Sequence, residues 1–194
     1  MKTARQPKVI AFSGASGCGK TTLIKKLAAQ FKCPYVLFDD HANQNTYPQD
    51  MKTWLEQGAD VTLISSPTFA PAINAAKTNN PTAPFVFIEE PFGKQRPDIA
   101  ELIDNVILLD VPLSLCLARI IKRRLASGEQ SSIAQLPDYL DRYESHLREV
   151  YLTVVNQVRL DCDFVLDELC SVGDSADRIA VWLRTSKSPL VNPD

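Results

Sequence analysis

The sequence lacks several features that would place it in a common class. Its five cysteines are odd in number and contain no C-x-x-C pair, so neither a disulfide framework nor a zinc site is indicated. No apolar run is long enough to span a membrane, and the polar stretch Met1 to Lys8 has no signal-peptide core. The formal net charge is -2 without a basic stripe, which disfavours a nucleic-acid partner. We therefore expect reduced thiols, a cytoplasmic location, and neither a membrane nor a nucleic acid as partner.

The size and composition are those of an ordinary folded domain. The chain has 194 residues, of which 45% are hydrophobic and 23% are charged. This is enough apolar material for one sizeable core. Because we find no internal repeat, low-complexity tract or linker, we expect a single domain.

The most informative stretch is Gly14-Ala15-Ser16-Gly17-Cys18-Gly19-Lys20-Thr21. It follows the apolar run Val9–Phe12 and precedes a helical pattern, and it fits G-x-x-x-x-G-K-S/T, the phosphate-binding P-loop. Glycines let the backbone approach a polyphosphate, and the start of the next helix favours an anion. Lys20 is expected to reach the β- and γ-phosphates, and Thr21 to hold Mg²⁺. We assign nucleotide binding to this loop together with Thr22.

Apolar strands alternate with helical patterns along the chain. The expected strands are Val9–Phe12, Tyr35–Phe38, Phe85–Ile88, Asn105–Leu109 and Phe164–Leu166. Helices are expected at Thr21–Phe31, Pro48–Gly58, Ala70–Lys77, Asp98–Ile103, Pro112–Leu125, Pro137–Leu160 and Asp174–Arg184, with a polar loop over Ala126–Leu136. This alternation predicts a three-layer α/β fold, in which helices cover both faces of a five-stranded parallel sheet.

Polar residues follow four of the expected strands: Ser13-Gly14, Asp39-Asp40, Glu89-Glu90 and Asp110. In open parallel sheets the ligand lies at the carboxyl ends of the strands. We therefore expect these acids to converge on the phosphate loop, although they are far apart in the sequence.

With these residues in view, the chain resembles the P-loop small-molecule kinases, especially the uridine kinase and nicotinamide riboside kinase group, from about Lys8 to Asp167. The resemblance implies one kinase domain over residues 1–184, a lid around residues 119–136 and a tail over residues 185–194. It also implies transfer of the γ-phosphoryl group of ATP, with Mg²⁺, to a hydroxyl of a small metabolite such as uridine or another riboside. Oligomeric state is left open.

The same resemblance suggests roles for acids after the second and third strands. Asp39 matches the acid that accepts the proton of the substrate hydroxyl, and Asp40 is the alternative. Glu89 matches the acid that serves Mg²⁺ with Thr21. The family usually has glycine where this chain has Glu90. Since neighbouring side chains on a strand point in opposite directions, only one of these two glutamates is expected to face the metal.

Arginines near the lid suggest handling of the transferred phosphoryl group. Arg119 and Arg123 lie four apart and share a helix face, and we assign both to catalysis beside Asp39 and Lys20. Arg142, on the next helix, is expected either to contact substrate or phosphate or to form a surface ion pair.

The acceptor is expected between the second strand and the 48–77 segment. Asp50 is a candidate for binding sugar hydroxyls, and Trp54 for stacking on a base, although core packing is the preferred role for Trp54. Two alternatives remain open. A nucleoside monophosphate kinase would need cations in this segment, which offers only Lys52 and Lys77. A regulatory P-loop ATPase would hydrolyse ATP without any small acceptor.

Overall fold

The computed structural model describes residues 6–185. Five parallel strands form one sheet in the order β2-β3-β1-β4-β5. Their bounds are β1 Lys8–Ser13, β2 Tyr35–Val36, β3 Phe85–Glu89, β4 Asn105–Leu109 and β5 Phe164–Leu166. The five strands are those expected from the sequence, and the parallel α/β fold is confirmed.

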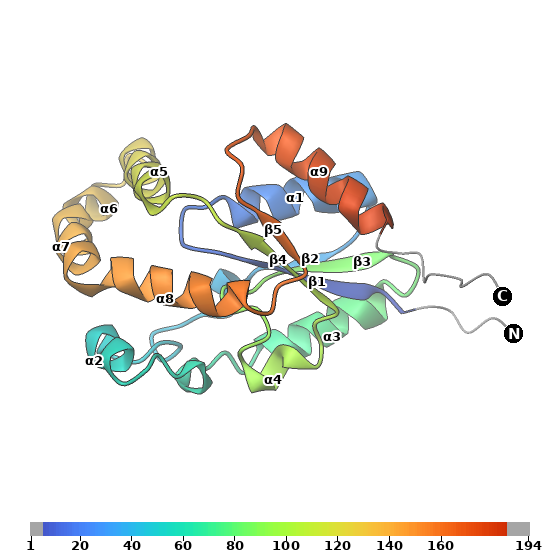
Figure 1. The fold of residues 1–194 in the computed structure, drawn as a ribbon, viewed down its shortest axis with the longest axis horizontal. Helices are drawn as coiled ribbons and strands as arrows, with labels where there is room; N and C mark the ends of the chain where they lie inside the picture. The colour runs from blue at the N-terminus through green and yellow to red at the C-terminus, as the bar shows by residue number, and fades with distance from the viewer. Residues whose placement is uncertain (1–5, 186–194) are drawn as a thin grey trace, which may run out of the picture.

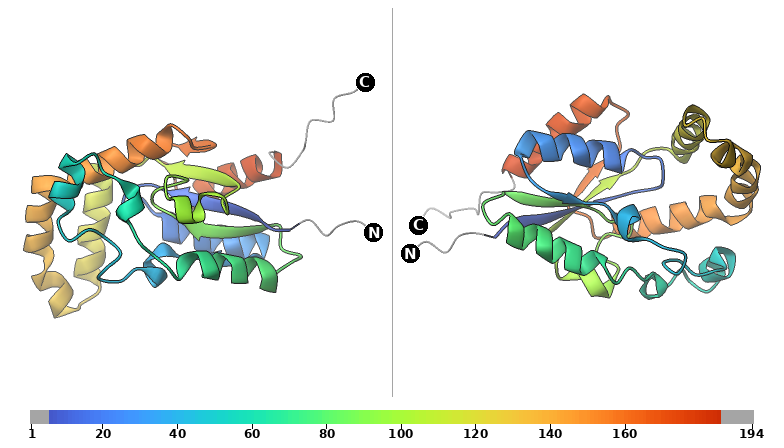
Figure 2. Two further views of the ribbon diagram at one scale, coloured as in Figure 1. Left: turned by 90° about the horizontal axis from the view of Figure 1, so that it is seen from below. Right: turned by 180° about the vertical axis from the view of Figure 1, so that it is seen from behind.

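Helices cover both faces of the sheet (Figures 1 and 2). Figure 1 shows α1 and α9 above the sheet and α3 and α4 below it. The helices are α1 Lys20–Phe31, α2 Met51–Glu56, α3 Phe69–Asn79, α4 Pro97–Ala100, α5 Leu113–Ala126, α6 Gln130–Ala134, α7 Leu136–Arg142, α8 Arg148–Arg159 and α9 Val172–Thr185. Short 3₁₀ turns span Phe38–His41 and Val61–Leu63, and a π-helical turn, Tyr143–Leu147, joins α7 to α8.

Three local predictions need correction. The second strand ends at Val36, and the expected strand residue Phe38 begins a 3₁₀ turn instead. The expected polar loop over Ala126–Leu136 contains the short helix α6, which buries none of its residues and therefore leaves no apolar stripe in the sequence. The expected tail lies outside the described residues, except for Thr185, which ends α9.

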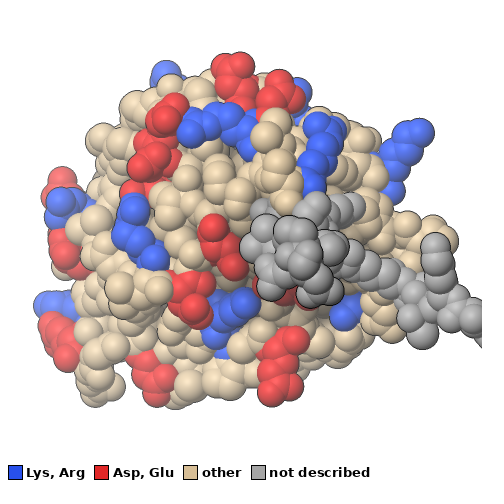
Figure 3. Space-filling view, turned by 45° about the vertical axis from the view of Figure 1, so that its right-hand side comes forward, with Lys and Arg blue, Asp and Glu red and all other residues tan. Residues whose placement is uncertain are grey.

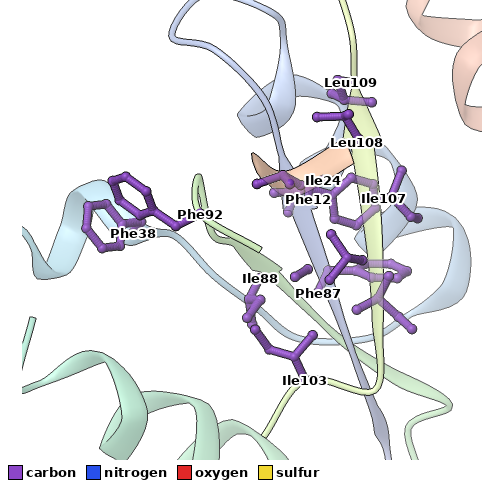
Figure 4. Close-up of a cluster of buried hydrophobic side chains, with 14 of the residues drawn as sticks. Phe12, Ile24, Phe38, Phe87, Ile88, Phe92, Ile103, Ile107, Leu108 and Leu109 are labelled. Carbon is purple, nitrogen blue, oxygen red and sulfur yellow. The ribbon is translucent and has the colours of Figure 1, made fainter. Parts of the chain in front are cut away.

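Aromatic and branched side chains from the central strands fill the core (Figure 4). Phe12 of β1 and Phe87 of β3 meet edge to face with ring centroids 5.6 Å apart. Phe31 at the end of α1 packs on Phe85 in the same way at 5.3 Å. Because such packing fixes β1 against β3, it also fixes the loops that leave their carboxyl ends.

A smaller hydrophobic cluster joins α5 to the α7–α8 segment. It consists of Ile120, Tyr139 and Tyr143, and it is separate from the main core. Arg124 lies over the Tyr139 ring, 4.5 Å from its centroid. Helices α5 and α7 thus pack on each other through a small hydrophobic cluster that is separate from the core of the sheet.

The surface mixes charges of both signs. Figure 3 shows lysines and arginines interspersed with acids over the face in view, without a stripe of one sign. Between residues 6 and 185, no helix is both long enough and apolar enough to cross a membrane.

Candidate functional site

The phosphate loop connects β1 to α1 and is held by close backbone packing. Gly14 and Gly17 have φ values of 136° and 84°, which side chains with a Cβ rarely adopt. A Cβ on Gly14 would lie 2.5 Å from the Leu109 carbonyl oxygen, and one on Gly17 would lie 2.4 Å from that of Cys116. Both glycines are therefore required by the approach of the loop to β4 and α5.

The first turn of α1 has a free end suited to an anion. Its N-cap, Gly19, offers no side chain, and the first turn contains no acid. Asp50, by contrast, caps α2 by accepting hydrogen bonds from the backbone N–H groups of Lys52 and Thr53. Because the first N–H groups of a helix lack intrahelical partners and carry partial positive charge, the start of α1 favours a phosphate.

Lys20, Thr21 and Glu89 form a compact group beside the loop. The Lys20 ammonium donates to the carbonyl oxygens of Gly14 and Ala15, at 2.9 and 3.1 Å, and lies 3.6 Å from a Glu89 carboxylate oxygen. The Thr21 hydroxyl donates to the other Glu89 oxygen at 2.9 Å. A hydroxyl and a carboxylate within hydrogen-bond distance fit Mg²⁺, which usually takes few protein ligands and completes its shell with water and phosphate.

Glu90 points away from this group and into the protein. Its carboxylate is fully buried, lies 3.3 Å from the Arg96 guanidinium and accepts a hydrogen bond from the Phe92 backbone N–H. Burial raises the pKa of Glu90 to about 8, and Arg96 and the Phe92 N–H offset only part of this effect. Of the two adjacent glutamates, only Glu89 lies next to the phosphate loop, as strand geometry predicts.

A cavity of about 620 Å³ opens in front of the loop. Most of the predicted site residues line it: Gly14, Ala15, Ser16, Gly17, Gly19, Lys20, Thr21, Thr22, Asp39, Glu89, Arg119, Arg123 and Arg142. The volume is within the range of small-molecule sites. The structure thus gathers residues from the phosphate loop, α1, the 3₁₀ turn after β2, β3, α5 and α7 around one space.

Four other predicted residues lie outside this cavity lining. Cys18 is buried under the loop, and Asp40 is exposed at the surface. Asp50 is engaged as the N-cap of α2. Trp54 is buried and donates its indole N–H to the Asp60 carbonyl oxygen at 2.8 Å, in agreement with the packing role preferred for it.

Asp110, expected among the converging acids, is also elsewhere. Its carboxylate pairs with Arg159 of α8, and it does not line the cavity. The prediction that the acid after the fourth strand joins the others is therefore wrong. The Asp110 carboxylate instead forms an ion pair with Arg159, which lies 49 residues further along the chain.

Among the described residues, the three arginines of the cavity form no ion pair with a carboxylate, a property that they share with Arg124 and Arg184. Arg96, Arg148, Arg159 and Arg178 each lie within 4.0 Å of a carboxylate, whereas within residues 6–185 no such pair involves Arg119, Arg123 or Arg142. Arg119 instead donates to the Cys18 carbonyl oxygen at 3.0 Å. Guanidinium groups without a carboxylate partner can bind phosphate oxygens through paired N–H donors.

Several lining residues were not assigned a role from the sequence. These further lining residues are Tyr47, Pro48, Gln49, Met51, Pro91, Phe92, Leu147, Val150, Tyr151 and Val154. On α8 the apolar residues follow helical spacing, which is equally typical of a stripe packed on the core. Burial raises the pKa of Tyr47, and the Asp39 carboxylate raises it further, so its hydroxyl remains protonated near this acid.

A second hollow of about 220 Å³ lies beside the loop. Gly19, Thr22 and Arg119 line both spaces, so Arg119 stands between them. The remaining walls of the second hollow come mainly from β4, α1 and the 166–175 segment, and include Leu23, Val111, Leu169 and Val172. This small space has both apolar and polar walls, and it borders the phosphate loop at Cys18 and Gly19.

The solved structures with a similar fold are distant in sequence. One is TT1252 from Thermus thermophilus, with a TM-score of 0.53 and 17% identity, covering 95% of this chain and 100% of that one. Another is the APS kinase CysC of Mycobacterium tuberculosis in complex with AMPPNP and APS, with a TM-score of 0.51 and 16% identity, covering 92% and 98%. Comparison with known protein families and with curated protein sequences finds no match. The chain has a three-layer α/β fold around a five-stranded parallel sheet, and it shares this fold with the two solved structures.

Proposed function

We propose that the chain is an ATP-dependent kinase that transfers the γ-phosphoryl group to a hydroxyl of a small metabolite, with a nucleoside such as uridine or another riboside as the first candidate. One observation carries the proposal. Asp39, Glu89, Lys20 and Thr21 line the same cavity as the phosphate loop, although they come from three separate elements. A phosphate site and a candidate base in one cavity are what phosphoryl transfer to an alcohol requires.

Each residue of the cavity has a proposed role that follows from its position. The loop and Lys20 bind the β- and γ-phosphates, and Arg119 and Arg123 neutralise charge on the transferred group. Thr21 and Glu89 would hold Mg²⁺, which would neutralise phosphate charge. The bond from the γ-phosphorus to the acceptor oxygen forms as the bond to the β-phosphate oxygen breaks. ADP leaves, and Asp39 accepts the hydroxyl proton.

The second hollow suits the base of the nucleotide. It adjoins Gly19 and Thr22 of the phosphate-binding segment, and its other walls include the apolar side chains of Leu23 and Val111. Leu169 and Val172, both exposed, would be covered by the base. We assign ATP to the two hollows jointly, with its phosphates between them.

We assign residues 119–136 to a mobile lid, within a kinase domain that spans residues 1–184. Part of α5 and all of α6 belong to this segment; it contributes one buried residue, Ile120, to the small cluster with Tyr139 and Tyr143, and none of its residues belongs to the main core. A segment with its own small packing centre can move against the sheet at low cost. Its closure would bring Arg119 and Arg123 onto the phosphates.

The nucleoside monophosphate alternative has less support. An acceptor phosphate needs cations, and neither Lys52 nor Lys77 lines the cavity. Arg142 is the one cationic side chain that the described residues add to the cavity beyond Lys20, Arg119 and Arg123.

The direct test is acceptor-dependent ADP formation. The protein is incubated with Mg-ATP and a panel of nucleosides, vitamins and sugars, and we expect ADP release to rise with at least one neutral alcohol. ATP hydrolysis that no acceptor stimulates would instead support the regulatory ATPase. Formation of a nucleoside diphosphate from a monophosphate would support the alternative kinase.

The candidate base is tested by a pair of adjacent variants. We expect Asp39→Asn to lower acceptor-dependent turnover by about 100-fold or more, because a positioned base typically contributes this much. Nucleotide affinity, measured by calorimetry with AMPPNP, should stay within about 2-fold. Asp40→Asn should retain turnover because Asp40 does not line the cavity. The reverse result would move the base to Asp40.

A further inference from the structure

One wall of the cavity is an apolar helix face. Leu147, at the end of the π-helical turn, and Val150 and Val154 of α8 follow spacings of three and four residues and line the same space. Val150 and Val154 are only 5% and 7% exposed, so their side chains are held firmly. Phosphates gain nothing from such a wall, because transfer of charge to an apolar surface is unfavourable.

Two aromatic rings continue this wall. Tyr47 and Phe92 both line the cavity, and the ring centroid of the buried Phe38 lies 6.2 Å from that of Tyr47 and 6.3 Å from that of Phe92. Figure 4 shows Phe38 beside Phe92. Phe38 is in turn backed by the Arg96 guanidinium, 5.1 Å from its centroid. Rings held from behind in this way form a preformed surface on which another ring can pack at little entropic cost.

The charges of the cavity oppose an anionic acceptor. Apart from Lys20 and the two α5 arginines assigned to ATP, its charged lining consists of Asp39, Glu89 and Arg142. Arg142 already donates from its Nε to the Asp138 carbonyl oxygen at 3.3 Å. Because Glu89 is paired with Lys20 and assigned to Mg²⁺, a second anion would face the Asp39 carboxylate and one partly engaged guanidinium.

We propose that the acceptor is an uncharged alcohol whose non-reacting part is an apolar ring. The ring packs on Val150, Val154 and Phe92, while its hydroxyl lies toward Asp39. This inference rests on the proposed function and narrows it, because it excludes phosphorylated acceptors and open-chain polyols. Gln49 and Tyr47 supply polar contacts at the edge of the ring.

The first test compares three probes on protein saturated with Mg-AMPPNP. The probes are 1,4-benzenedimethanol, a neutral ring alcohol; 4-(hydroxymethyl)benzoate, its anionic counterpart; and ribitol, a polyol. Titration followed by saturation-transfer NMR should show the neutral ring alcohol binding at least 10-fold more tightly than the other two. Equal or tighter binding of the benzoate or of ribitol, or binding of none of the three, would overturn the inference.

A matched pair of valines tests the wall itself. Val150→Thr and Val155→Thr make the same isosteric change on one helix at buried positions, but only Val150 lines the cavity. We expect Val150→Thr to weaken binding of 1,4-benzenedimethanol by about 5- to 10-fold, since the added hydroxyl must be desolvated. Val155→Thr should change it by less than 2-fold. Equal effects would overturn the inference. If Val150→Thr does not fold, Val154→Thr replaces it.

These binding measurements are independent of turnover. If the protein prefers the neutral ring alcohol but forms no ADP with any acceptor, the inferred pocket is supported and the proposed kinase function is contradicted. If the protein phosphorylates only phosphorylated or polyol acceptors, the kinase function is supported and the inferred acceptor class is contradicted.

Discussion

At the scale of single residues, the buried side chains of Glu90 and Arg96 are the least ordinary feature. Arg96 is fully buried, and among the described residues its three guanidinium nitrogens form no hydrogen bond within geometric limits. Its partners are the Glu90 carboxylate, the half-exposed Asp98 carboxylate at 3.8 Å, and the rings of Phe38 and Phe69. These contacts link the segment after β3 to the turn that carries Asp39.

The raised pKa of Glu90 predicts a pH dependence of stability. The folded protein binds this proton more tightly than the unfolded chain, whose carboxyl has its ordinary pKa of 4.5. The resulting stabilisation is fully present below about pH 4.5 and is lost as the pH rises toward 8. We expect the unfolding free energy of the native protein to fall by about 3–4 kcal/mol more than that of Glu90→Gln between about pH 5 and pH 8.

Urea unfolding at several pH values measures this difference. Glu149→Gln is the control, because Glu149 belongs to an exposed pair with Arg148 whose contribution is small. Parallel pH curves for the native protein and Glu90→Gln would show that Glu90 is ionised in the folded state at neutral pH.

At the scale of elements, α5 has two differently used faces. Arg119 and Arg123 point into the cavity, whereas Arg124 lies on the Tyr139 ring and Lys122 is exposed. Four-residue spacing places the first two on one face, and this much could be predicted from the sequence. That Arg124 packs on α7 could not be, because its ring partner lies fifteen residues away in a separate helix.

The two faces of α5 predict different effects on turnover. We expect Arg123→Ala to lower acceptor-dependent kcat by about 100-fold, since arginines at a transferring phosphoryl group contribute this much or more. Lys122→Ala removes the neighbouring charge outside the cavity and should leave kcat within about 2-fold. Steady-state ADP formation at saturating ATP compares them. Equal losses in both variants would assign the effect to the net charge of the helix.

Elements with a weak local pattern were the ones not predicted correctly. Helix α6 is exposed and polar, so it leaves no periodic apolar signal. Strand β2 lies at the sheet edge and pairs only through Tyr35 and Val36 with β3. Its apolar residues continue to Phe38, but Phe38 turns inward to the aromatic cluster and directs the following residue, Asp39, to the cavity.

At the scale of the whole molecule, strand order assembles the site. Placing β1 between β3 and β4, with β2 beyond β3, brings the phosphate loop, Glu89 and Asp39 to one edge of the sheet. A ligand that bridges these segments should stabilise the entire fold, because it binds the folded chain and not the unfolded one.

Thermal unfolding tests this coupling. Mg-AMPPNP at about 100 times its dissociation constant should stabilise the protein by about 2.7 kcal/mol and raise the melting temperature by about 5–10 °C. Lys20→Met should lose most of this shift, because Lys20 lies at the loop. Lys25→Met, an exposed position on the same helix, should retain it. A shift of equal size in both variants would place the nucleotide elsewhere.

The sequence alone determined the phosphate loop, the order of strands and helices, and the parallel sheet. These follow from short-range patterns: glycine spacing, apolar strands of few residues, and helical periodicity. The resemblance favoured Asp39 and Glu89, but only the tertiary structure showed that Glu90 is buried against Arg96, that Asp110 pairs with Arg159, and that α8 forms an apolar wall. A local sequence pattern cannot distinguish the directions of two adjacent identical side chains. Their directions are fixed by packing against elements that are remote in the chain.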